Sequence, residues 1–340
     1  MISDAKPMKE AAAKTVTKKE RKKLNPQTKR SYMWAYLFIL PQALVFFVLS
    51  LYPIVMSYVY SFFDWQGIGP LKNFIGFDNY VRLLHDPRFW GDFLNTITYV
   101  VGTTVIGVMF ALILAIILND NKMRGKTFYR TIYFLPVVTT TAIVGIIMEN
   151  IFGVVGLANK VLQTLHLVES PIPFLTNGAW AMTVLILVGS WKGLGITMIY
   201  WLAGLQGISS DLYESAQLDG AGFWKTLRHI TLPLLKPILA VIVLLSIVSG
   251  MHVFDLVKTL TNGGPYFKTE TLDLYIYNYA FTDSHDNGIS LMGYASAAGV
   301  ILGLFTFIIS FAFGGVGFAS SIKNWWKARK AKKEGGMVQP

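Results

Sequence analysis

Six long apolar runs alternate with polar segments along the chain. A bilayer core of about 30 Å requires about 20 consecutive apolar residues in a helix. The runs cover residues 33–60, 95–118, 131–152, 179–204, 237–257 and 289–318. This pattern predicts an all-α integral membrane protein with six transmembrane helices. Pro41 and Pro53 fall inside the first run, where we expect kinks because proline interrupts the hydrogen-bond ladder of a helix.

Lysine and arginine are unequally divided among the polar segments. The 340-residue chain has a net charge of +11, from 30 Lys and Arg against 19 Asp and Glu. Of the basic residues, 23 lie in the two terminal segments and in the second and fourth connecting loops, and six lie in the other three loops. Because the cytoplasmic segments of membrane proteins carry the excess of Lys and Arg, we expect both termini to be cytoplasmic.

The two ends of the chain, residues 1–32 and 319–340, are polar and strongly basic. We interpret them as cytoplasmic tails whose charge is a topology signal, and we expect 1–32 to be mobile. Contact with anionic lipid is the alternative for this charge. Nucleic-acid binding is not expected, because aromatic residues do not interleave with the charges of residues 1–30.

The composition argues against several functional classes. Only 14% of the residues are charged, whereas soluble domains average about 25%. The absence of cysteine excludes disulfides, thiolate zinc sites and iron–sulfur clusters, and the five histidines lack ligand spacing. Gly125-Lys126-Thr127 resembles the end of a phosphate-binding loop, but Asp120 stands where such a loop requires glycine. We therefore expect a non-enzymatic protein with no metal and no cofactor in this chain.

The fourth loop, residues 205–236, is polar enough to leave the membrane and has a helical pattern. A helix start can be capped there by Ser209, Ser210 or Asp211. The glycine-rich turn 220–222 should end this helix. A second helical stretch over 223–229 is expected to stop near Pro233.

Within this loop, Glu214-Ser215-Ala216 is followed after three residues by Gly220, and nine residues later by Ile230-Thr231-Leu232-Pro233. This spacing resembles the EAA motif of the membrane subunits of binding-protein-dependent ABC importers, with Ser215 as the one departure. The resemblance implies a cytoplasmic coupling helix that docks in a cleft of an ATPase subunit. The residues implied in this contact, in its turn, or in setting the second helix against the membrane domain are Glu214, Ser215, Ala216, Asp219, Gly220, Ile230, Leu232 and Pro233.

Looser matches elsewhere resemble the sugar-specific branch of this family, in particular the first permease subunit of maltose and glycerol-3-phosphate systems. They lie in residues 40–65, 74–84, 253–281 and 293–297. The resemblance implies a permease subunit of an ATP-driven importer for a sugar or oligosaccharide, in the plasma membrane of a bacterium or archaeon. Its implied partners are a second, similar permease, two ATPase subunits that bind ATP and Mg, an external solute-binding protein and membrane lipid.

Two other classes remain open from the residues alone. A self-sufficient secondary transporter or channel would need no ATPase and usually shows an internal repeat, which we do not find between residues 33–152 and 179–318. An integral-membrane enzyme would need a catalytic constellation, and no pattern of that kind is present.

Ionisable residues inside apolar runs are functional candidates, because an unpaired charge in a membrane is costly. Lys192 lies deepest, and it could form a salt bridge with Glu149 or Asp255, line a transport cavity, or be exposed at the outer mouth. Aromatic rings can stack on sugars but more often serve packing, and Trp201 is one such ring. The candidate substrate pathway comprises Glu149, Trp191, Lys192, Phe254, Asp255 and Tyr294.

Overall fold

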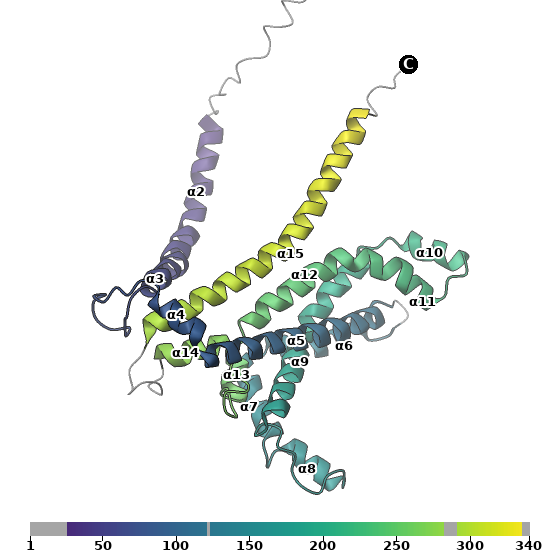
Figure 1. Cartoon of the computed structure of the whole chain (residues 1–340). Helices are drawn as coiled ribbons and strands as arrows, with labels where there is room; N and C mark the ends of the chain where they lie inside the picture. Colours follow the sequence, from purple (N-terminus) through teal and green to yellow (C-terminus); the bar gives the residue numbers. More distant parts are fainter. Residues whose placement is uncertain (1–25, 121–122, 282–290, 335–340) are drawn as a thin grey trace, which may run out of the picture. The chain divides into compact units, whose positions relative to one another are not determined.

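The computed structural model describes residues 26–120, 123–281 and 291–334, with side chains for 30–120, 123–281 and 291–313 (Figure 1). Most of the predicted N-terminal tail and the last six residues lie outside this part of the chain. The described part is almost entirely helical and contains only one isolated β-bridge, between Phe63 and Phe74. The chain divides into two units, residues 1–56 and 57–340, which we describe separately.

The first unit holds the apolar N-terminal helix. Helix α2 covers Pro26–Phe46, a π-helical turn η1 covers Phe47–Leu51, and α3 (Tyr52–Tyr60) begins directly after it. Large apolar side chains between Met33 and Val55 are exposed along this helix, for example Phe38 at 80% and Leu49 at 70%. Such a surface requires lipid or another polypeptide around it.

The second unit holds the remaining helices. They are α4 (Asp78–His85), α5 (Pro87–Asn119), α6 (Lys126–Val138), α7 (Thr141–Phe152), α8 (Leu157–Thr164), α9 (Gly178–Gln206), α10 (Ser210–Leu218), α11 (Phe223–Thr226), η2 (Leu227–Thr231), α12 (Leu232–Met251), α13 (Asp255–Leu260), α14 (Leu272–Phe281) and α15 (Met292–Glu334).

Six helical segments in the described chain are long and apolar enough to cross a membrane, which confirms the predicted number. They cover Arg30–Tyr60, Pro87–Asn119, Thr141–Thr164, Gly178–Gln206, Phe223–Met251 and Met292–Phe313. The helices do not follow the third and fifth apolar runs throughout. The third run, 131–152, is divided where α6 ends at Val138 and α7 begins at Thr141. The fifth run continues past the end of α12 into α13.

The expected end of a helix near Pro233 is wrong. The chain is helical without interruption from Phe223 to Met251, because a π-helical turn at Leu227–Thr231 directly precedes the proline segment. In an α-helix the proline ring clashes with the carbonyl four residues before it, and the wider π turn gives the ring room. The same arrangement precedes Pro53, where η1 ends at Leu51.

Helices α5 and α9 form the most extensive pair in the second unit, and α12 packs against both (Figure 1). Small residues allow the close approach, since a Cβ atom on Gly102 would lie 2.7 Å from Cδ1 of Ile186. A buried cluster between the three helices includes Ala111, Trp201 and Leu235. A second cluster joins α4 and the start of α5 to α14 and α15, which places the beginning of α5 against residues nearly 200 positions later.

Candidate functional site

Helix α10 lies in the fourth loop at the position of the EAA motif. The Ser209 hydroxyl caps its start by accepting a hydrogen bond from the Asp211 N–H at 3.3 Å. At its end the Gly220 N–H donates to the Gln217 carbonyl (3.0 Å) and the Ala221 N–H donates to the Ala216 carbonyl (2.8 Å). This pair of bonds is a Schellman turn. It places Gly220 at φ +71°, which explains glycine at this position.

One side of α10 contacts the helix that follows, and the other side is exposed to solvent. Ala216 is buried, and the Tyr213 hydroxyl lies 3.2 Å from the Thr231 hydroxyl, which is itself buried. Glu214, Ser215 and Asp219 are exposed on the remaining surface, together with Leu218. The helix therefore presents an exposed, acidic surface that a partner can reach.

The residues implied in holding the second helix occupy different environments. Ile230 is half-buried, whereas Leu232 and Pro233 are exposed. The buried contacts of this segment come from Thr231 and Leu235 instead. The motif spacing contains no information on Leu235, so sequence reasoning missed this residue.

A cavity of about 510 Å³ lies among α5, α7, α9, α12 and α13. Lys192, Phe254 and Asp255 line it, although they come from segments about 60 residues apart. Residues that carry hydroxyl groups also line it, namely Tyr99, Thr103, Thr141, Ser190, Thr197, Tyr200, Ser246 and Ser249. The cavity has the size typical of small-molecule sites, and its hydroxyls can exchange hydrogen bonds with a polar ligand.

Lys192 is half-buried in the cavity wall, and Asp255 and Glu149 are exposed. Among the described residues, no ion pair joins Lys192 to either carboxylate. The Lys192 ammonium group is thus available to the cavity.

The other predicted pathway residues do not line this cavity. Trp191 lines a separate pocket of about 300 Å³ beside α6. Tyr294 is buried, and its hydroxyl donates to Asp86 at 3.0 Å. Trp201 is 1% exposed and donates its indole N–H to the Val108 carbonyl, so it serves packing.

His252 is a cavity residue that sequence reasoning missed, because a single histidine has no spacing signal. It follows the end of α12, and its Nδ1 atom lies 3.6 Å from a carboxylate oxygen of Asp273. The Asp273 carboxylate, as an acceptor and an opposite charge, raises the pKa of His252 above its ordinary value. The ring is therefore oriented toward Asp273 and gains positive charge at a higher pH than a free histidine.

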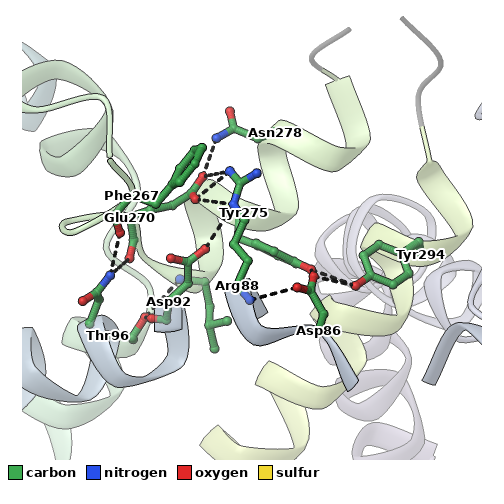
Figure 2. Close-up of polar contacts among 11 residues, drawn as sticks. Asp86, Arg88, Asp92, Thr96, Phe267, Glu270, Tyr275, Asn278 and Tyr294 are labelled. Atoms are coloured by element: carbon green, nitrogen blue, oxygen red, sulfur yellow. Dashed lines mark hydrogen bonds and ion pairs between the residues drawn. The ribbon is translucent and has the colours of Figure 1, made fainter. Parts of the chain in front are cut away.

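A polar network fastens the start of α5 to the segment before α14 (Figure 2). Arg88 donates to both carboxylate oxygens of Glu270, at 2.7–2.9 Å, and Asn278 donates to the same carboxylate at 2.6 Å. Asp92 lies 3.9 Å from the Arg88 Nε atom. Glu270 and Asp92 are both 1% exposed. The Glu270 carboxylate is tolerated at this buried position because Arg88 and Asn278 donate hydrogen bonds to it.

The same network extends to the start of α15. The Tyr275 hydroxyl donates to Asp86 and lies 2.8 Å from the Tyr294 hydroxyl. Burial, aided by the bond to Asp86, raises the pKa of Tyr275, so that its hydroxyl keeps its proton and remains a donor. Asn95 donates to the backbone carbonyls of Phe267 and Glu270, at 2.9 and 3.0 Å. These bonds hold the starts of α5, α14 and α15 together.

Comparison with known proteins adds independent findings. Residues 89–317 match the family described as binding-protein-dependent transport system inner membrane component. The chain is 34% identical over 278 residues to a lactose transport system permease protein of Rhizobium radiobacter, covering 81% of this chain and 91% of that protein. It is 35% identical over 279 residues to an arabinooligosaccharides transport system permease protein of Bacillus subtilis, covering 81% and 85%.

Solved structures with the same fold include a bacterial ABC transporter involved in the import of the acidic polysaccharide alginate. The TM-score is 0.74 at 25% identity, covering 86% of this chain and 96% of that chain. A bacterial alginate ABC transporter in complex with an alginate pentasaccharide-bound periplasmic protein gives a TM-score of 0.72 at 26% identity, with coverage of 84% and 93%.

Replacing Glu270 tests the network. Glu270→Ala leaves the Arg88 charge buried without its main partner. We therefore expect the free energy of unfolding to fall by about 3–5 kcal/mol. Thermal unfolding of the detergent-purified protein measures the change. Lys268→Ala removes an exposed charge two residues away and should leave the midpoint nearly unchanged. Equal effects of the two variants would contradict a structural role for the ion pair.

The His252–Asp273 pair predicts a pH dependence of stability. Because the folded pKa of His252 is raised, the pair stabilises the fold fully below the unfolded value of about 6.5 and loses this effect as pH rises through the folded value. The difference in melting temperature between wild type and Asp273→Asn should therefore be larger at acidic pH than at alkaline pH. In a His252→Gln background, the same substitution should show no such trend.

Proposed function

The chain belongs to the family of binding-protein-dependent transport system inner membrane components, and we propose that it is the permease subunit of an ATP-driven importer for a sugar or an oligosaccharide. Relatives named for lactose and for arabinooligosaccharides support this substrate class. The hydroxyl-lined cavity supports it as well, because sugars are held chiefly by hydrogen bonds to their hydroxyl groups.

The partners follow from this proposal. A second, similar permease completes the pathway, an external solute-binding protein delivers the substrate, and two ATPase subunits bind ATP and Mg. The fold shared with a transporter solved in complex with a periplasmic protein supports the external partner. The chain would lie in the plasma membrane of a bacterium or archaeon with both termini in the cytoplasm, which the distribution of Lys and Arg supports.

One observation carries the coupling mechanism. The helix that contacts α10 through Thr231 is continuous from Phe223 to Met251. Its 29 residues span a length of about 43 Å at 1.5 Å per residue. Its far end contributes Gly250 to the cavity wall, and His252 follows. A displacement of α10 by the ATPase would pass through the Tyr213–Thr231 contact into this helix and reach the cavity. Alternating access of the cavity to the two sides of the membrane would follow.

A self-sufficient secondary transporter or channel is not favoured. Such a protein needs no docking surface for an ATPase. In the family to which this chain belongs, the ATPase contact lies in the segment that corresponds to α10, which is exposed and acidic here.

The coupling role of α10 is tested by co-purification. We expect an ATPase subunit to co-purify with the tagged full chain, and Glu214→Lys or Gly220→Pro to reduce its yield severalfold. The first reverses an exposed charge, and the second removes the N–H bonded to Gln217 and cannot adopt a positive φ.

A matched control for Gly220 lies two residues away. Gly222 has φ −74° and open space at its Cβ position, so Gly222→Ala should retain the ATPase. An ATPase yield unaffected by Glu214→Lys and Gly220→Pro would contradict the coupling assignment.

Lys192 tests the substrate pathway. Lys192→Ala should lower the kcat/KM of uptake by about tenfold or more, because hydrogen bonds from a charged group contribute about 1.5–3 kcal/mol. Assembly with the ATPase should be unchanged. Lys160→Ala, at an exposed position outside the cavity, is the control. Normal uptake kinetics in the Lys192 variant would remove this residue from the pathway.

A further inference from the structure

The fourth loop has two halves of opposite charge. Residues 209–222, which contain α10, hold Asp211, Glu214 and Asp219 and no Lys or Arg. Residues 223–236, the basic arm, hold Lys225, Arg228 and Lys236 and no Asp or Glu. This division suggests that the two halves contact partners of different chemistry, since a single charged partner would repel one of them.

The charges of the basic arm lie on its accessible side. Lys225, Arg228 and Lys236 are exposed, whereas Thr231 and Leu235 are buried. His229 is also exposed, and its ring bonds to the Lys225 carbonyl at 3.0 Å. In the described part of the chain, no ion pair neutralises the three basic side chains.

Two aromatic residues begin the arm. Trp224 is 76% exposed and Phe223 is 60% exposed, with their ring centroids 5.4 Å apart. Tryptophan beside Lys and Arg is the composition of helix ends at a membrane surface, where the ring lies among the headgroups and the cations face phosphate.

The length of the helix is consistent with a position of the basic arm at the headgroups of the membrane. The segment Phe223–Met251 has 29 residues, and a hydrocarbon core of about 30 Å takes about 20 of them. If α12 (Leu232–Met251) occupies the core, the residues before it project about 13 Å beyond the core, at and just above the headgroups. Lys236 lies little more than one turn inside this boundary, from which a lysine side chain can reach back to the headgroups.

We propose that the basic arm binds the headgroup of an anionic phospholipid in the cytoplasmic leaflet, leaving α10 for the ATPase. Arg228 and Lys236 hold the phosphate, and Trp224 lies at the interface. The choice of leaflet rests on the proposed function. The lipid contact anchors the helix that links α10 to the cavity, so movement of α10 is passed along the helix instead of tilting its free end.

Lipid titration tests the proposal on the purified full-length chain. Native mass spectrometry compares its binding of dioleoylphosphatidylglycerol with that of dioleoylphosphatidylcholine. We expect wild type to prefer phosphatidylglycerol and Arg228→Gln/Lys236→Gln to lose about fivefold in that preference for each charge removed.

The control pair is Lys160→Gln/Lys268→Gln, at exposed positions in loops expected on the other side of the membrane. The N-terminal basic residues are present in every variant, so a difference between the pairs reports on the arm. An unchanged preference in the Arg228/Lys236 variant, or an equal loss in the control, would overturn the proposal.

A photo-crosslink identifies what contacts the arm without altering its charges. Trp224→benzoylphenylalanine, illuminated in native membranes, should form an adduct with phospholipid. Absence of a lipid adduct, or a dominant adduct with an ATPase or a second permease, overturns the proposal. Glu214→Lys should reduce the ATPase yield severalfold and keep the lipid preference, so failure of the coupling assignment and failure of the lipid site give different results.

Discussion

The buried ion pair between Arg88 and Glu270 is the contact on which the arrangement of the second unit depends. It joins residues 182 positions apart and brings the start of α5 to the segment before α14. Glu270 is almost inaccessible to solvent, so its carboxylate cannot exchange its protein partners for water. Around this pair, Asn95, Thr96 and Tyr275 satisfy backbone and side-chain groups of the same two segments. A polar network of this extent holds α5 in place where it forms one wall of the cavity.

Another wall of the cavity is formed by α12, which belongs to a helix that stays continuous through Pro233. The π-helical turn Leu227–Thr231 keeps α11 and α12 continuous, and α10 is attached at this turn through Tyr213 and Thr231. The acidic surface of α10 and the cavity are therefore connected by one continuous element.

The basic residues of the chain are arranged in two different ways. Most of it lies in the terminal segments and fits a topology signal. The basic arm differs, because its charges are ordered on the exposed side of a helix beside Trp224. Bulk composition does not distinguish these cases, since the fourth loop as a whole is balanced between three basic and three acidic residues.

The sequence alone determined the features that depend on neighbouring residues. Six apolar runs predict six membrane helices because hydropathy over about 20 residues decides membrane insertion, and Gly220 marks the end of α10 because only local backbone geometry is involved. The direction in which each side chain points, and the pairing of distant segments, depend on how the helices pack against one another. Lys192, Phe254 and Asp255 share a cavity, whereas Trp191 and Tyr294 face elsewhere. A run of apolar residues predicts that a segment lies in the membrane, but it does not predict which way each side chain points around the helix axis. The partners of Arg88 and His252 lie too far along the chain for any local pattern to indicate them.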